Sequence, residues 1–241
     1  MPTAVTHQIL AEEVYKSLPD DMQNKIGKLG YYYLGAQGCD ILFLYKFIST
    51  ASDNFGRFLH KNQPLLFFKI LFEEAKKDKS VQAYAYGHIT HYAADTVFHP
   101  YIYGLPKGKK TLVHHAVEHA YDGVFLRKFK EEKLFFYRLP SPKRLNLTGI
   151  YNVYARYARE SGWGKLQKKA FERAVKYYYA LNFTRTPFFK AKNAKRADEL
   201  FSIAKDRGVR LICAFAKESA GDFAAEDFGR HYLSGKIATK K

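Results

Sequence analysis

Apolar residues recur every three or four positions along most of the chain, which is the period of an α-helix. The first stripe comprises Val5, Ile9, Leu10, Val14 and Leu18. Pro19 and the two aspartates after it predict that this helix ends there and that a new one begins. No apolar–polar alternation of period two is long enough to predict a sheet. The pattern therefore predicts an all-α protein.

The same period predicts further helices over 65–78, 80–98, 111–131, 148–160, 165–181, 193–217 and 222–233. His99 and Pro100 are expected to close the helix over 80–98, because proline has no amide hydrogen to continue it. No internal repeat and no linker-like change of composition divides the chain. We therefore expect one domain over residues 1–241, a multi-helix bundle.

The composition is that of a folded protein, since 47% of the 241 residues are hydrophobic and 17% are aromatic. Lys46 and Lys69 interrupt the longest apolar runs, which are far shorter than the ~20 residues of a membrane-spanning helix. We therefore expect no integral membrane segment. Glu12 and Glu13 stand where a secretory signal would continue its apolar run. Only two cysteines are present, which excludes a disulfide framework and leads us to expect a cytoplasmic protein.

The formal net charge is +17. The basic excess is concentrated between Lys165 and Arg196, where ten lysines and arginines accompany one acidic residue, Glu172. Such a charge favours an anionic partner, namely phosphate esters, nucleic acid or an acidic membrane surface. It also fits plain solubility, and the C-terminal part over 145–241 fits helices with a basic outer face and an aromatic core face. Both interpretations stay open on composition alone.

The stretch GHITHYAADTVFHPYIYG has no lysine, arginine or glutamate. Its polar positions include His88, His91, Asp95 and His99. His91 and Asp95 are four residues apart, so a helix places them on one face, and His99 extends that face by another turn. Imidazole and carboxylate at one-turn spacing are a common way to hold a divalent metal.

A second cluster strengthens the metal hypothesis. In LVHHAVEHAYDG, His114 and Glu118 are four residues apart, and His115 and His119 form a parallel pair, with Asp122 one turn further on. Six of the nine histidines fall between residues 88 and 119. The Glu-x-x-His pairs of di-iron bundles and the HExxH of zincin proteases are absent, as are phosphate-binding glycine motifs.

Five segments, taken in order, resemble the zinc-dependent phospholipase C family, which is related to the P1-type nucleases specific for single strands. They are the Thr6-His7 pair and the stretches LGAQGCDILF, FLHKN, HYAADTVFH and HHAVEHAYD. The resemblance extends from about residue 5 to residue 125. It implies an all-helical fold with up to three zinc ions at the bottom of a cleft. Carried over residue by residue, the implied ligands, all within 7–122, are Asp40, His60, His91 and Asp95 for one ion, Asp95 and His7 for a second, and His99, His114 and Glu118 for a third.

The resemblance also implies roles around these ligands. Asp40 and Asp95 are the expected catalytic residues, Asp40 by orienting or deprotonating the attacking water and Asp95 by bridging two ions. The other polar residues of the two clusters match no family ligand, and we expect them to orient ligands or to pack around them. They are His88, His115, His119 and Asp122.

Two departures from the family pattern stand out. Secreted members use the amine and carbonyl of their processed first residue on the ion that takes the early histidine. Here removal of Met1 would leave Pro2, whose secondary amine could ligate instead. The spacing from Asp95 to His99 is also shorter than in the best-known members. Helix geometry permits it, although the third site could be shifted.

The expected function is phosphodiester hydrolysis of the phospholipase C type, in which zinc-activated water cleaves the phosphate–glycerol bond of a phospholipid. Peripheral contact with an anionic membrane would fit the basic charge. Two alternatives remain on the sequence: a P1-like nuclease or phosphoesterase acting on nucleic acid, and a non-catalytic basic helical module that contains zinc.

Overall fold

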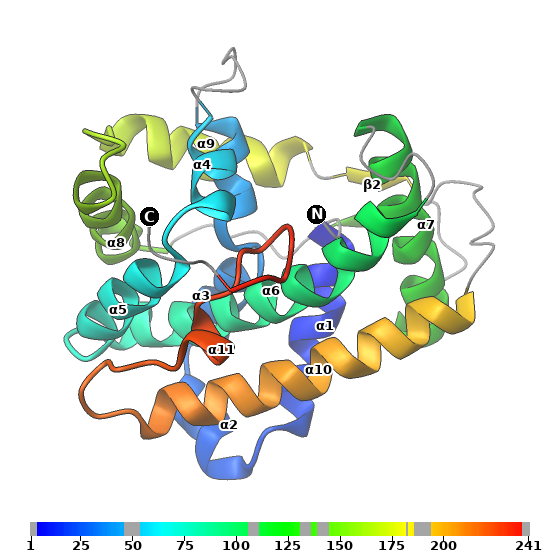
Figure 1. Ribbon diagram of the computed structural model, residues 1–241, viewed down its shortest axis with the longest axis horizontal. Helices are drawn as coiled ribbons and strands as arrows, with labels where there is room; N and C mark the ends of the chain where they lie inside the picture. Colours follow the sequence, from blue (N-terminus) through cyan, green and yellow to red (C-terminus); the bar gives the residue numbers. More distant parts are fainter. Residues whose placement is uncertain are drawn as a thin grey trace.

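The computed structural model describes residues 4–45, 54–105, 111–130, 136–138, 145–181, 183–185 and 194–237. The fold is all-α (Figure 1). Its helices are α1 (Ala4–Ser17), α2 (Asp20–Ile26), α3 (Leu29–Ala36), the 3-10 helix η1 (Gly38–Leu44), α4 (Phe55–Lys61), α5 (Pro64–Ala75), α6 (Lys79–Gly104), α7 (Thr111–Lys130), α8 (Thr148–Glu160), α9 (Lys168–Leu181), α10 (Ala194–Lys217) and α11 (Ala225–Phe228).

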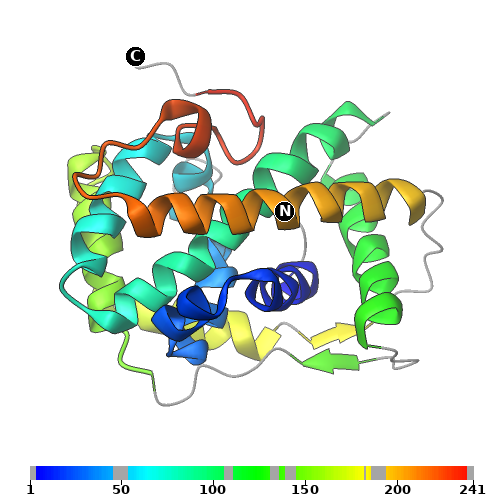
Figure 2. The same cartoon turned by 90° about the horizontal axis from the view of Figure 1, so that it is seen from below.

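Helix α6 runs through the middle of the molecule, and other helices pack against much of its length (Figure 1). Its start is capped by Asp78, whose side chain accepts a hydrogen bond from the Ser80 amide. Helices α3, α5, α10 and α1 pack against it. Figure 2 shows α10 crossing the width of the molecule and α7 standing at one end of it. A helix enclosed in this way carries its polar residues inside the protein, which is where the histidines and aspartate of α6 lie.

Two glycines allow α3 and α6 to approach closely. A Cβ on Gly35 would collide with the Tyr84 carbonyl oxygen, and one on Gly87 would collide with the Tyr32 carbonyl oxygen. The obstacles are backbone atoms, so neither helix can make room by turning a side chain. This crossing fixes the position of η1, which follows α3 almost directly in the chain.

The expectation that His99 and Pro100 end this helix is wrong, because α6 continues to Gly104. Proline removes one hydrogen bond from the helix and disfavours its interior. Here packing on both sides of Pro100 outweighs that cost: His99 and Ile102 are both completely buried. The histidine ring is also tied to the C-terminal segment, since its Nδ1 donates to the Tyr232 carbonyl oxygen at 3.1 Å.

Other ranges match the sequence expectation to within a few residues, with three exceptions. The short helices α3, η1 and α4 were not expected from the apolar period. The prediction of a helix over 222–233 is wrong for most of that range, since only Ala225–Phe228 is helical. A two-stranded antiparallel sheet also joins β1 (Phe136–Arg138) to β2 (Phe183–Arg185), each strand three residues long.

The buried apolar side chains form one continuous cluster, in which aromatic rings are prominent. Helix α9 is amphipathic: on one face Phe171 and Tyr178 are buried in the core, and on the other Lys169 and Lys176 are exposed. The basic residues of this helix are therefore an outer face. Within the described ranges, none of the helices combines the length and the apolar character needed to cross a membrane.

Candidate metal centre

Helix α6 supplies three polar side chains to the buried site. His91, Asp95 and His99 follow one another at one-turn spacing and are all completely buried. The imidazole nitrogens approach Asp95 from both sides, with His91 Nε2 at 3.5 Å from Oδ2 and His99 Nδ1 at 3.7 Å from Oδ1. The structure therefore brings together the three residues that the spacing placed on one face.

Helices η1 and α4 bring Asp40 and His60 to the same place. His60 Nδ1 donates to the Gly56 carbonyl oxygen at 2.6 Å, which directs Nε2 toward the cluster. That nitrogen lies 3.1 Å from Asp40 Oδ1 and 3.3 Å from Asp95 Oδ2. Gly38, at the start of η1, has φ of +53° and a Cβ there would collide with the His91 ring. Only glycine fits both requirements.

His7 reaches the cluster from α1. Its Nε2 lies 3.5 Å from Asp95 Oδ1 and 3.7 Å from Asp40 Oδ2. The preceding residue is held by Asp122 of α7, whose Oδ1 accepts from the Thr6 amide at 3.0 Å and from the Thr6 hydroxyl at 2.6 Å. Asp122 thus positions the backbone beside His7. The expected contribution of Met1 and Pro2 lies outside the described residues.

A third group joins the end of α6 to α7. The hydrogen bond from His99 Nδ1 to the Tyr232 carbonyl leaves Nε2 facing Glu118, at 3.8 Å from Oε1. His114 Nε2 lies 2.7 Å from the same oxygen. Nitrogen and oxygen atoms of His99, His114 and Glu118 all lie within 4.8 Å of one another, so one ion could contact all three.

Several buried atoms of this cluster form no hydrogen bond with the described part of the chain. Leaving such groups unpaired costs about 1–3 kcal/mol each, and more when they are charged. A divalent cation would satisfy the carboxylate oxygens and one ring nitrogen of each imidazole, and nitrogen and carboxylate donors suit zinc. The residues therefore fit a metal centre. The unpaired atoms are His7 Nδ1 and Nε2, Asp40 Oδ1, His91 Nδ1, both carboxylate oxygens of Asp95, and His99 Nε2.

The carboxylates of the cluster have different electrostatic surroundings. Burial raises the pKa of Asp40. Burial also acts to raise the pKa of Asp95, but the His91 and His99 imidazoles outweigh it and hold that pKa well below its usual range. Burial also acts to raise the pKa of Glu118, but opposing interactions, which include hydrogen bonds from His114 and His115, lower it to about 2. Asp95 and Glu118 are therefore fixed negative charges.

The remaining predicted residues lie around the cluster. His88 is completely buried, and its Nε2 is 2.9 Å from the Tyr232 hydroxyl, with its ring packed on Phe67. The side chains of His115 and His119 are about half exposed, at 53% and 46%. His115 contacts Glu118, since its Nδ1 lies 3.3 Å from Oε2. Whether these residues orient ligands stays a prediction.

Two residues of the site were missed by reasoning from the sequence. Cys39 is completely buried, and its Sγ lies 3.5 Å from His60 Nε2 and from His91 Nε2. Burial raises the pKa of its thiol to about 11. Tyr232 contacts two histidines of α6 from the C-terminal segment. The one sequence signal for Cys39 was its place directly before Asp40.

Access to the cluster is greatest on the side of α7. The His114 side chain is 9% exposed, while the side chains of His7, Asp40 and Asp95 are at most 1% exposed. Tyr103, half-buried, stacks on the His114 ring with centroids 5.1 Å apart. Substrate that reaches the cluster past described residues therefore meets His114 and Tyr103 first.

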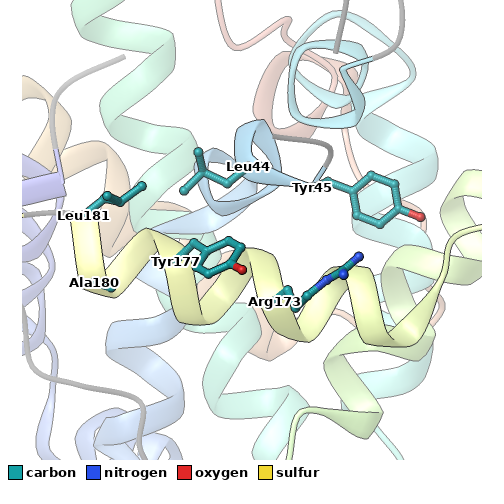
Figure 3. A pocket seen from close by; sticks show the side chains of 6 residues that line it. All are labelled: Leu44, Tyr45, Arg173, Tyr177, Ala180 and Leu181. Atoms are coloured by element: carbon teal, nitrogen blue, oxygen red, sulfur yellow. The ribbon is translucent and has the colours of Figure 1, made fainter. Parts of the chain in front are cut away.

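A separate cavity of about 500 Å³ lies beside the end of η1, the helix that carries Asp40 (Figure 3). Its volume is in the range of small-molecule sites. Arg173 supplies a positive charge, while most of the surface is apolar or aromatic. None of the candidate ligands lines it. The described residues that line it are Leu44, Tyr45, Arg173, Tyr177, Ala180 and Leu181.

Comparison with known proteins agrees with this geometry. The family model described as zinc-dependent phospholipase C matches residues 6–164. This range contains all the candidate ligands from His7 to Glu118, and it covers more than half of the chain. No curated protein and no solved structure gave a significant match. The chain belongs to the zinc-dependent phospholipase C family.

Proposed function

We propose that the protein is a zinc-dependent phosphodiesterase that cleaves the phosphate–glycerol bond of a phospholipid. The observation that carries the proposal is the position of Asp95. Its two oxygens lie 3.3–3.5 Å from Nε2 atoms of His60, His91 and His7, which come from three separate helices. A carboxylate enclosed by imidazoles on both sides fits a ligand that bridges two ions. Family membership and the three candidate metal groups support the same reaction class.

Bound ions would polarise the phosphoryl oxygens, neutralise developing charge and lower the pKa of a bound water. Asp95 holds its negative charge between the two histidine groups and remains ionised. Asp40 Oδ1 faces His60 and His91. Its other oxygen, Oδ2, orients the attacking water and accepts its proton. The buried ring of histidines excludes bulk water, so every charge interaction there is stronger than at the surface.

The cavity beside η1 supports a lipid substrate. Tyr177 and Leu181 are exposed at 42% and 59%, an unusual position for large apolar side chains on a helix whose other exposed residues are mostly basic. Lys169, Arg173 and Lys176 on the same outer face are exposed and positively charged. Apolar groups for acyl chains beside cations for phosphates match an anionic lipid surface.

Parallel assays of the zinc-loaded protein test this function. The substrates are a water-soluble short-chain phosphatidylcholine, bis-p-nitrophenyl phosphate and single-stranded DNA. We expect release of phosphocholine from the lipid to be the fastest reaction. Preferred cleavage of DNA would favour the nuclease alternative, and cleavage of none would leave a zinc-containing binding module.

A matched pair of variants links the reaction to the cluster. Asp95→Asn removes the central charge, and we expect a loss of activity of at least about 100-fold, as for residues that supply transition-state electrostatics. Asp206→Asn makes the same chemical change at an exposed position of α10, and its activity should equal that of the unaltered protein. Equal activity of both variants would contradict the role of Asp95.

A further inference from the structure

We propose that Cys39 is a thiolate ligand of the metal ion held by Asp40, His60 and His91, an inference that rests on the metal centre proposed above. Neither the composition nor the family-derived ligand set assigned a role to this cysteine. The structure places its sulfur in one group with a carboxylate oxygen of Asp40 and ring nitrogens of the two histidines, all within 4.8 Å of one another.

The distances between these atoms are short enough for one ion to contact all four residues. A Zn–N bond of about 2.0 Å and a Zn–S bond of about 2.3 Å, at a tetrahedral angle, put nitrogen and sulfur about 3.5 Å apart. Sγ of Cys39 lies 3.5 Å from Nε2 of both His60 and His91, and equally far from His60 Nδ1. The His60 and Asp40 atoms are 3.1 Å apart, and the His91 and Asp40 atoms are 3.7 Å apart.

A hydrogen-bonded thiol explains less of this geometry. The thiol has one hydrogen, so it can serve only one of the two histidine nitrogens at a time. Asp40 Oδ1 and Asp95 Oδ2 would then remain buried without a hydrogen bond in the described part of the chain. A shared cation satisfies sulfur, nitrogens and carboxylates together. Its binding releases the thiol proton to solvent, because the ligand is the thiolate.

A sulfur ligand makes the site soft, so it should select zinc, cobalt or cadmium over magnesium, manganese and calcium. Asp95 also contacts these histidines, since its Oδ2 lies 3.3 Å from His60 Nε2 and 3.5 Å from His91 Nε2. The ion would therefore have five candidate ligands, with the sulfur and the bridging carboxylate of Asp95 added to Asp40, His60 and His91. This arrangement keeps Asp95 available to a neighbouring ion.

Cobalt substitution tests the proposal directly, because a thiolate on Co²⁺ gives a sulfur-to-cobalt charge-transfer band in the near ultraviolet. The 241-residue chain has only two cysteines, so Cys213→Ser is the matched control for Cys39→Ser. We expect the band in the unaltered protein and in Cys213→Ser, and its loss in Cys39→Ser. Loss of the thiolate should also weaken the tightest zinc by at least about tenfold, since even residues that only orient ligands cost that much.

The outcomes separate the two proposals. Cobalt bound without the band would overturn the assignment of Cys39 while leaving the metal centre intact. Failure of the unaltered protein to bind cobalt or zinc would defeat the metal centre itself, and the ligand role of Cys39 with it. If Cys39→Ser does not fold, X-ray absorption of the unaltered zinc protein decides between the alternatives. A sulfur neighbour of zinc at about 2.3 Å would support the ligand role of Cys39. Only nitrogen and oxygen neighbours, at about 2.0–2.2 Å, would overturn it.

Discussion

Asp95 Oδ2 and His60 Nε2 lie 3.3 Å apart, although one residue belongs to α6 and the other to the short helix α4. Both side chains are completely buried. The contact depends on His60 Nδ1 being held by the Gly56 carbonyl, which aims the other ring nitrogen at the carboxylate. Burying the charged carboxylate of Asp95 without a cation beside it costs free energy, because the charge is removed from water. The stability of this contact is most readily explained by a cation between the two residues.

The close crossing of α3 and α6 leads to a prediction about Gly87. Gly87→Ala places a methyl group against the Tyr32 backbone, and we expect it to lower the free energy of unfolding by at least about 2 kcal/mol. The control is Gly104→Ala in the same helix, where no described atom lies within 4 Å of the added Cβ. That change should leave stability equal or slightly higher. Urea denaturation measures both, and equal losses would contradict the crossing.

Burial of His88 predicts an acid-sensitive fold. Burial lowers the pKa of His88 from 6.5 to about 3, so between these values the unfolded chain binds a proton that the folded chain does not. The free energy of unfolding therefore falls as the pH falls through this window. From about pH 7.5 to about pH 5.5 the loss from this one group is about 1 kcal/mol.

The measurement compares unaltered protein with His88→Gln, both freed of metal so that metal release does not add its own pH dependence. Glutamine keeps a polar group near the Tyr232 hydroxyl but does not titrate. We expect a smaller decrease of stability for His88→Gln over this pH range. Identical pH profiles of the two proteins would show that His88 does not supply the effect.

Much of the helical framework could be predicted from the sequence because long amphipathic stretches reveal their period. α8 and α10 begin and end within a residue of the expected positions. The 3-10 helix η1 could not be predicted in this way, since most of its residues are buried and no polar face marks a period. The continuation of α6 past Pro100 also could not be predicted, because it depends on contacts with residues around Tyr232, which is distant in the sequence.

The candidate site shows the same division. His91 and Asp95 share a helix, so their spacing predicted their common face. Asp40, His60 and His7 were placed only by the family resemblance, since no period relates residues on separate helices. Cys39 carried no local signal apart from its neighbour Asp40, and its role in the cluster becomes visible only through its distances to two histidines.

The exposed apolar residues of α9 lead to a prediction about lipid surfaces. Leu181→Ser removes a side chain that is 59% exposed beside the cavity. We expect hydrolysis of anionic phospholipid vesicles to fall by up to about tenfold, the equivalent of about 1.4 kcal/mol of lost apolar contact. Hydrolysis of bis-p-nitrophenyl phosphate should not change, because that substrate needs no surface.

The matched control is Ile203→Ser, since Ile203 is 51% exposed but lies on α10, away from the cavity-lining residues. We expect its activity on vesicles to be unaltered. If both variants lose vesicle activity equally, the effect is one of general surface hydrophobicity. If neither does, α9 is not the lipid-facing surface.

Elemental analysis of zinc per chain tests the central claim most directly. The protein is purified from zinc-supplemented medium, dialysed to remove loosely bound ions, and compared with Asp95→Asn and with Asp206→Asn. We predict stoichiometric zinc, with up to three ions per chain, in the unaltered protein and in Asp206→Asn, and at least one ion fewer in Asp95→Asn. Unaltered protein without bound zinc, or an Asp95→Asn variant that retains all of it, would contradict the account.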